Sequence, residues 1–208
     1  MTDRPLIGID FDNTIASYDH VFASAAAELA LLPNGFTGSK TAVREAIRRT
    51  EAGEVGWMRL QGQVYGRLMH RARPCDGVLE FLARCRAVGL PVLVISHKTE
   101  FGHYDPHRVN LREAALTWME KIGLLDEAKT GLSRNRVHFE ATRAEKVRRI
   151  ARAGCTHFID DLPEVFAEPD FPSVVGRYLY DPDERCPEGP YTITHSWLEI
   201  ADDLLGRV

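Results

Sequence analysis

The sequence predicts an α/β fold: a three-layer, Rossmann-like core with a mostly parallel sheet, plus a small all-helical domain inserted into it. Two observations support this prediction. Short apolar runs alternate with amphipathic helical stretches in most of the chain, which is typical of β-α-β units and a parallel sheet. Residues 17–73, in contrast, contain helical patterns only. We therefore expect a core of residues 1–16 and 74–208 and a helical domain of residues 17–73.

One strand and several helices are expected in the first third of the chain. Residues 5–9 form a short apolar run that ends in acidic residues, which predicts a buried parallel strand. Pro33-Asn34-Gly35 should end the first helix of the insertion. Ser39 can cap the second helix, because its hydroxyl satisfies a free backbone N–H. The helices expected in this segment cover residues 20–32, 39–52 and 55–69.

Beyond residue 73, strands and helices alternate. An amphipathic helix over residues 76–88 ends at Gly89, as helices often do, and residues 91–95 are a second apolar strand. Ligands bind at the carboxyl ends of strands in such sheets, so polar residues that end the strands are candidates for a functional site. The other expected elements are helices over residues 108–122, 142–153 and 195–205 and strands over residues 137–139, 156–159 and 173–179.

The composition argues against several classes of protein. The 208 residues are 44% hydrophobic and carry a net charge of −4, which argues against a general nucleic-acid binder because such proteins usually have a basic surface. None of the four cysteines forms a C-x-x-C pair, so a zinc ribbon is not expected. Neither a signal peptide nor an apolar run of the ~20 residues that cross a membrane is present. We expect a cytoplasmic protein without nucleic-acid or membrane partners, and its oligomeric state stays open.

Acidic residues follow two of the expected strands. Asp10 and Asp12 come directly after the first strand, and an extended chain would direct both toward the same side. Two carboxylates this close repel each other and favour a bound cation. Asp160 and Asp161 follow the strand expected over residues 156–159 and could complete an oxygen-rich site. Mg²⁺ prefers a few carboxylates together with water and substrate phosphate, so these residues predict Mg²⁺ as cofactor and phosphoryl chemistry.

In four dispersed motifs the chain resembles the haloacid dehalogenase superfamily. Each motif ends a predicted strand or begins a predicted helix. In chain order the motifs are Asp10-Phe11-Asp12-Asn13-Thr14 (the D-x-D-x-T form), Ser96, Lys146 and Asp160-Asp161. Their order and context fit the whole predicted core. The resemblance implies that residues 1–16 and 74–208 form the catalytic core and that residues 17–73 form a cap that closes over the site.

The resemblance implies separate catalytic roles for the two acids of the first motif. Asp10 would be the nucleophile that attacks phosphorus and forms an aspartyl-phosphate. Asp12 would protonate the leaving group and then activate water as a base. The dehalogenases of the superfamily lack an acid at this second position. Because the leaving group of a phosphate ester needs a proton, Asp12 favours a phosphatase over a dehalogenase.

The metal ligands implied by the resemblance come from both acidic motifs. They are Asp10, the backbone carbonyl of Asp12, and Asp161, which would bind Mg²⁺ directly. Asp160 would be a supporting partner or an alternative ligand. The resemblance thus leaves open which of Asp160 and Asp161 binds the metal.

The substrate phosphate would be bound by residues of the second and third motifs. Ser96 would donate a hydrogen bond to a phosphoryl oxygen, and Lys146 would neutralise the nucleophile and the phosphate. Lys98, two residues after Ser96, is an alternative to Lys146. His97 is a further candidate for contact with the phosphate.

The predicted function is therefore Mg²⁺-dependent hydrolysis of the phosphomonoester of a small soluble metabolite. A phosphomutase is an alternative, since it forms the same aspartyl-phosphate but returns the phosphoryl group to a sugar. A non-catalytic binding or regulatory module on the same fold is the other alternative. The intact acids at positions 10, 12 and 161 disfavour that module.

Overall fold

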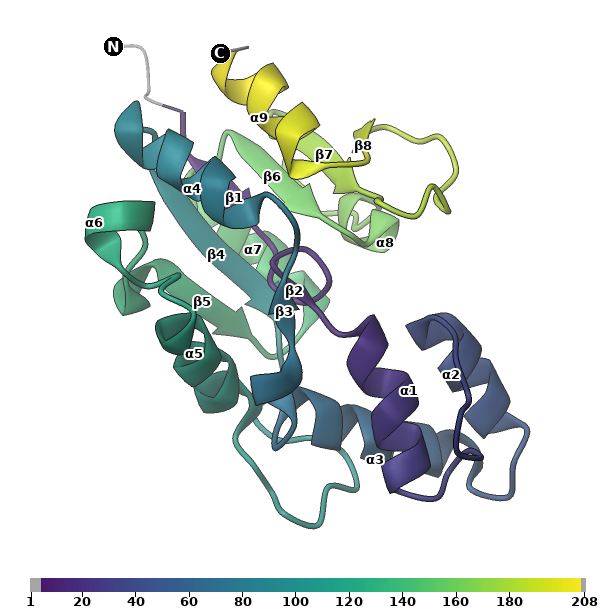
Figure 1. The fold of residues 1–208 in the computed structure, drawn as a ribbon. Helices are drawn as coiled ribbons and strands as arrows, with labels where there is room; N and C mark the ends of the chain where they lie inside the picture. Colours follow the sequence, from purple (N-terminus) through teal and green to yellow (C-terminus); the bar gives the residue numbers. More distant parts are fainter. Residues whose placement is uncertain (1–4, 207–208) are drawn as a thin grey trace. The chain divides into compact units, whose positions relative to one another are not determined.

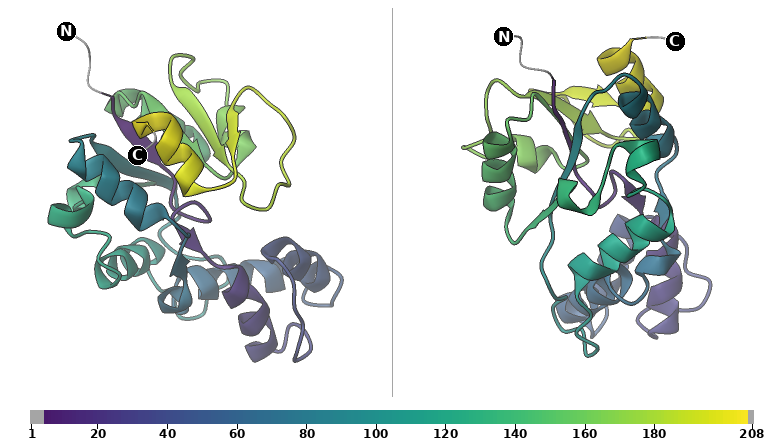
Figure 2. Two further views of the ribbon diagram at one scale, coloured as in Figure 1. Left: turned by 45° about the horizontal axis from the view of Figure 1, so that its top comes forward. Right: turned by 90° about the vertical axis from the view of Figure 1, so that its left-hand side faces the viewer.

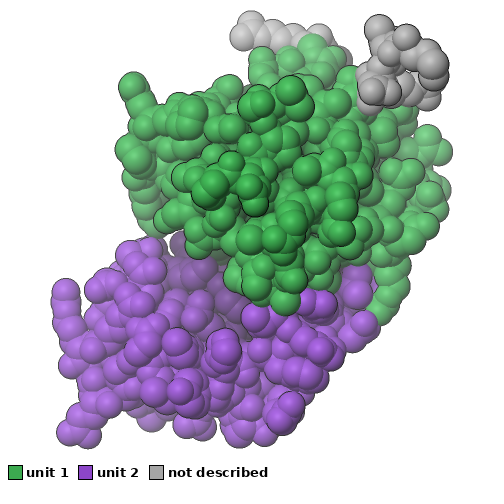
Figure 3. All heavy atoms as spheres, turned by 180° about the vertical axis from the view of Figure 1, so that it is seen from behind, with its two compact units in different colours: residues 1–16, 74–98, 122–208 green, residues 17–73, 99–121 purple. Residues whose placement is uncertain are grey.

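The computed structural model describes residues 5–206, and this part of the chain divides into two compact units (Figure 3). The first unit comprises residues 5–16, 74–98 and 122–206, and the second comprises residues 17–73 and 99–121. Residues 99–121, which the sequence pattern predicts to be part of the core, belong to the second unit. There the indole Nε1 of Trp118 donates to the Ala72 carbonyl at 3.1 Å. The predictions for residues 1–4 and 207–208 lie outside the described residues.

The first unit is built on a six-stranded sheet in the order β5-β4-β1-β6-β7-β8 (Figure 1). Every neighbouring pair of strands runs parallel. The predicted α/β fold class is therefore confirmed, with one strand, β8, that the sequence pattern does not predict. The strands are β1 (Ile7–Ile9), β4 (Val92–His97), β5 (Val137–Glu140), β6 (His157–Asp160), β7 (Gly176–Tyr180) and β8 (Thr192–Thr194).

Helices cover both faces of this sheet (Figure 2). On one face α4 lies between α6 and α9, and on the other α7 packs on β4 and β5. Apolar side chains of α7 and α8, including Val147, Ile150 and Phe166, form a buried core with Phe158 of β6. The helices are α4 (Val78–Ala87), α6 (Glu127–Thr130), α7 (Arg143–Ala153), α8 (Pro163–Phe166) and α9 (Trp197–Leu205), with a 3-10 turn η2 (Arg134–Arg136) before β5.

The second unit is helical. Its core includes Phe22, which stacks on Trp57 at a ring-centroid distance of 5.2 Å. Two short strands, β2 (Ala16–Ser17) and β3 (Arg73–Pro74), pair with each other at the two ends of its first segment, residues 17–73. Its helices are α1 (Asp19–Glu28), α2 (Lys40–Arg48), α3 (Gly53–Tyr65), the 3-10 turn η1 (Met69–Arg71) and α5 (Leu111–Lys121).

Two glycines hold the loop before α5 close to α3. A Cβ atom on Gly102 would lie 2.5 Å from the Cα of Gly62. The buried Asp105 of the same loop accepts a hydrogen bond from Gln63 Nε2 at 3.0 Å. The segment 99–110 is therefore fixed to the second unit by backbone contact as well as by a buried hydrogen bond.

Gly102→Ala is expected to destabilise the protein by roughly 1–3 kcal/mol, because the added methyl group meets backbone atoms that cannot move independently. Urea unfolding measures this change. The exposed His103 in the same loop supplies the control, since His103→Ala should leave the unfolding midpoint unchanged. Equal midpoints for Gly102→Ala and the control would contradict the proposed close contact.

No helix within residues 5–206 combines the length and the apolar character that a membrane crossing requires.

Candidate active site

The candidate site lies at the carboxyl ends of the central strands of the first unit. The chain continues from β4 outward to β5 on one side of β1, and from β6 outward to β7 on the other side. Parallel sheets bind ligands where the strand order diverges in this way. Ile9 of β1 pairs with Ile159 of β6, so Asp10 and Asp160 are the next residues along two adjacent parallel strands. The sheet itself thus places these two acids side by side.

The loop that follows β1 turns back on itself. The backbone N–H of Asp10 still donates to the Ile159 carbonyl at 2.9 Å, as in a continuing strand. The N–H groups of Ile15 and Ala16 then both donate to the Phe11 carbonyl, at 2.9 and 3.0 Å. Asn13 has a φ of 60°, a left-handed conformation that Asn tolerates better than most residues. The loop therefore presents Asp10, Asp12 and Asn13 within a short, tightly hydrogen-bonded turn.

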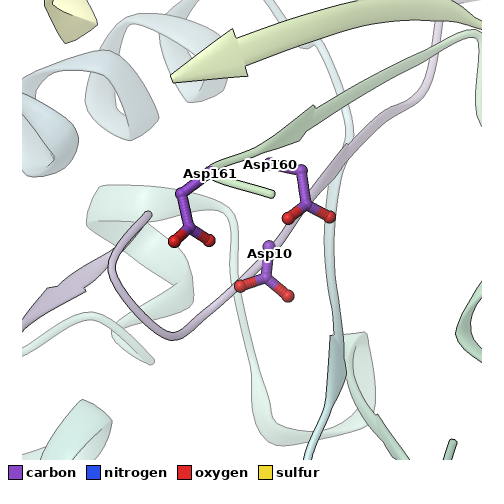
Figure 4. Close-up of side chains that lie close together, drawn as sticks. All are labelled: Asp10, Asp160 and Asp161. Atoms are coloured by element: carbon purple, nitrogen blue, oxygen red, sulfur yellow. The ribbon is translucent and has the colours of Figure 1, made fainter. Parts of the chain in front are cut away.

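Three carboxylates meet at this edge of the sheet (Figure 4). Asp10, Asp160 and Asp161 each offer one oxygen, and these oxygens all lie within 4.8 Å of one another. Asp10 and Asp160 are buried, and Asp161 is half-buried. Within residues 5–206 this is the one group of three or more Asp, Glu, His or Cys side chains close enough to hold a metal ion. Its all-oxygen chemistry suits a hard cation such as Mg²⁺.

Asp161 is oriented by the first motif. Its carboxylate accepts hydrogen bonds from Asn13 Nδ2 at 3.2 Å and from Thr14 Oγ1 at 3.4 Å. These two contacts connect residues 148 and 147 positions apart in the chain. The resemblance assigns no role to the Asn13 and Thr14 side chains, and the only signal for them in the sequence is their place in the D-x-D-x-T motif.

Lys146 lies between two of the three carboxylates. Its Nζ is 2.5 Å from Asp10 Oδ1 and 2.5 Å from Asp160 Oδ2, and all three side chains are buried. Burial by itself would lower the pKa of the Lys146 ammonium, but the Asp10 and Asp160 carboxylates outweigh burial and raise it. Burial raises the pKa of Asp160, and the nearby Asp10 carboxylate raises it further. The Lys146 ammonium lowers this pKa but does not outweigh burial, so the Asp160 pKa is above its usual value.

The start of α7 explains how Lys146 reaches the site. Thr142 caps the helix: its side chain accepts a hydrogen bond from the Glu145 N–H, and the Glu145 side chain accepts one from the Thr142 N–H. This capping box fixes the first turn of the helix. The next residues on the same helix, Val147 and Ile150, are buried in the core beneath the sheet. Lys146 is therefore held on a rigid first turn.

Lys98 contacts the other acid of the first motif. Its Nζ lies 3.0 Å from Oδ1 and 2.8 Å from Oδ2 of Asp12. The side chain of Asp12 does not belong to the three-carboxylate group. Of the two lysines considered from the sequence, Lys146 contacts the predicted nucleophile Asp10, and Lys98 contacts the predicted acid and base Asp12.

The two predicted phosphate ligands of β4, Ser96 and His97, have different surroundings. Ser96 is buried in the strand, in register with Phe139 of β5. The Nε2 atom of His97 lies 3.0 Å from the Ala141 carbonyl oxygen, so this nitrogen carries the proton. Partial burial lowers the pKa of His97, although the Ala141 contact opposes the change. His97 stays a predicted phosphate ligand beside Ser96.

The fold is shared with solved hydrolase structures. A haloacid dehalogenase-like hydrolase from Streptococcus pneumoniae has a TM-score of 0.61 at 11% identity, over 96% of this chain and 98% of its own. A HAD family hydrolase from Deinococcus radiodurans R1 was solved with bound phosphate and sodium. It has a TM-score of 0.63 at 14% identity, over 97% of this chain and 96% of its own. An L-2-haloacid dehalogenase has a TM-score of 0.56 at 12% identity, over 98% and 100%.

No protein-family model and no curated protein matches the sequence. The structural comparisons nevertheless show the fold: the chain has the fold of the haloacid dehalogenase superfamily hydrolases.

Proposed function

We propose that the protein is a Mg²⁺-dependent phosphomonoesterase that hydrolyses a small soluble phosphorylated metabolite through an aspartyl-phosphate on Asp10. The observation that carries this proposal is the buried position of Asp10, in contact with Lys146 and beside Asp160 and Asp161. Such a carboxylate is fixed in place and close to positive charge, as a nucleophile that attacks an anionic phosphate must be. The phosphate and sodium bound to the Deinococcus radiodurans hydrolase add support from a protein of the same fold.

Asp10 would carry out the first step. Lys146 holds Oδ1, which leaves Oδ2 to attack phosphorus. The new bond joins Oδ2 to phosphorus, and the bond from phosphorus to the ester oxygen breaks. The departing oxygen takes the proton of Asp12. In the second step Asp12 accepts a proton from water, whose oxygen attacks phosphorus. Inorganic phosphate leaves, and the Asp10 carboxylate is restored.

Asp10, Asp160 and Asp161 would hold the Mg²⁺ ion, with the backbone carbonyl of Asp12 as a further ligand. The ion supplies positive charge that offsets the carboxylates and the transferring phosphoryl group. Each of the three acids offers an oxygen to this group, and the group would supply the negative charge that a divalent cation needs. Asn13 and Thr14 would keep Asp161 oriented toward it.

Removal of the metal is expected to abolish phosphate release. Asp161→Asn should raise the Mg²⁺ concentration for half-maximal activity by about tenfold or more, because even residues that only support the metal ligands change metal affinity by this much. Phosphate release measured against Mg²⁺ concentration tests both effects. Asp170→Asn is the matched control, because Asp170 is exposed in the same unit. Full activity in excess chelator would contradict a metal-dependent mechanism.

Asp12 favours phosphate esters over haloacids as substrates. A halide leaves carbon without a proton, whereas an alkoxide leaving group needs one, and Asp12 lies two residues after the nucleophile to supply it. The proposal is tested with p-nitrophenyl phosphate and a panel of phosphorylated metabolites in the presence of Mg²⁺. Free phosphate is the expected product. Halide release from a haloacid would instead indicate a dehalogenase, a requirement for a bisphosphate activator would indicate a mutase, and no turnover would favour a binding module.

A further inference from the structure

Lys98 is a second buried lysine in the candidate site, and the proposed reaction leaves it without a role. Its side chain is 2% exposed, and its Nζ contacts both carboxylate oxygens of Asp12. The same Nζ lies 5.4 Å from the centre of the Phe11 ring. The backbone N–H of Lys98 donates to the Glu140 carbonyl of β5 at 2.9 Å, so the lysine is anchored at both ends.

A buried ammonium is unfavourable unless it is paired, and this one is paired with a specific carboxylate. Asp12 lies in the hydrogen-bonded turn that follows β1 rather than inside a strand, and its side chain is 19% exposed. A free side chain there could adopt several rotamers. Contact between one ammonium and both oxygens restricts the carboxylate to one orientation. Holding a catalytic group in the productive orientation can change a rate by about 100-fold.

We propose that Lys98 is a positioning residue that holds Asp12 in the orientation in which it exchanges protons with the leaving group and with water. This inference rests on the proposed function, since it assigns Lys98 to the acid and base of that reaction. The two buried lysines then have different roles, because Lys146 contacts the nucleophile and Lys98 orients the proton donor.

The role of Lys98 can be measured through the leaving group. The p-nitrophenolate ion is stabilised by its nitro group and departs readily without a proton, whereas phenolate gains much more from proton donation by Asp12. The ratio kcat/KM for each ester reports the steps up to formation of the phosphoenzyme, so later reaction with water does not affect it. Substitution of a residue that acts through Asp12 should therefore lower kcat/KM for phenyl phosphate much more than kcat/KM for p-nitrophenyl phosphate.

Lys98→Met is expected to lower kcat/KM for phenyl phosphate about 10- to 100-fold and to change that for p-nitrophenyl phosphate by less than about threefold. Asp12→Asn should show the same selectivity, with a loss on phenyl phosphate of roughly 10²- to 10⁴-fold. In the Asp12→Asn background, Lys98→Met should add little further loss. Lys98→Arg, which keeps the positive charge, should recover part of the phenyl phosphate activity.

Lys129→Met is the control, because Lys129 is also paired with an aspartate but is exposed on the surface, and it should leave both substrates unaffected. Equal losses on the two esters, or additive losses in the double variant, would overturn the proposal. If Lys98→Met is unfolded at the assay temperature, Lys98→Gln, which keeps an N–H donor, is compared on the two esters with the same criterion. Absence of phosphate release by the wild-type protein would instead refute the proposed function itself.

Discussion

Asp10→Asn is expected to reduce phosphomonoester turnover by about 10⁴-fold or more, because the neutral amide is a far weaker nucleophile than the carboxylate it replaces. The fold should survive the change. Lys146 keeps its second partner, Asp160, at 2.5 Å, and one of three crowded acids becomes neutral. Steady-state release of phosphate from p-nitrophenyl phosphate measures the loss, and circular dichroism verifies the fold.

The control for this variant is Asp126→Asn. Asp126 also has a lysine partner, Lys129 at 2.8 Å, but that pair lies on the surface. The same chemical change there should leave turnover unaltered. Substantial activity in folded Asp10→Asn would show that another group attacks the substrate.

Lys146→Met is expected to be the most destabilising of the single substitutions in the site. It leaves the buried Asp10 and Asp160 carboxylates side by side without their ammonium partner. Breaking a buried ion pair from one side typically costs about 3–5 kcal/mol, and here that magnitude would lower the Tm by roughly 10 °C. Turnover should also be lost, because the positive charge beside the nucleophile is gone.

The change in Tm on addition of Mg²⁺ is a second test of the charges around Lys146. A cation bound by the three acids replaces part of the missing positive charge, so Mg²⁺ should raise the Tm of Lys146→Met more than that of the wild-type protein. Lys129→Met serves as the control and should respond to Mg²⁺ as the wild type does. An unchanged Tm in Lys146→Met, or equal Mg²⁺ shifts in all three proteins, would contradict the arrangement of charges described for the site.

The central strands could be predicted because they are buried. β1 lies wholly in the interior, so its sequence is a continuous apolar run, and the same holds for most of β4. In β6 the two central residues, Phe158 and Ile159, are apolar and buried. An apolar run of this kind can be recognised in a sequence as a buried strand. The acids that follow it can be recognised as well, because they end the apolar run. The nearness of Asp10 and Asp160 then follows from adjacent parallel strands.

Other features depend on tertiary structure that a local pattern does not carry. β8 is three residues long, and its first residue, Thr192, is exposed, so it lacks an apolar run. Residues 99–121 have an amphipathic pattern that would suit either unit, and their contact with the second unit depends on the close approach of Gly62 and Gly102. The contact between Lys98 and Asp12 joins residues 86 positions apart, and it requires the order of β1 and β4 in the sheet.

Covalent phosphate on Asp10 tests the central claim most directly. The protein is mixed with Mg²⁺ and p-nitrophenyl phosphate that carries a labelled phosphoryl group, quenched in acid within the first turnover, and digested to locate the label. We predict a hydroxylamine-sensitive label on Asp10, which accumulates further in Asp12→Asn because water is no longer activated, and which is absent from Asp10→Asn. Phosphate release without a labelled enzyme, or a label on any other residue, would contradict the proposed mechanism.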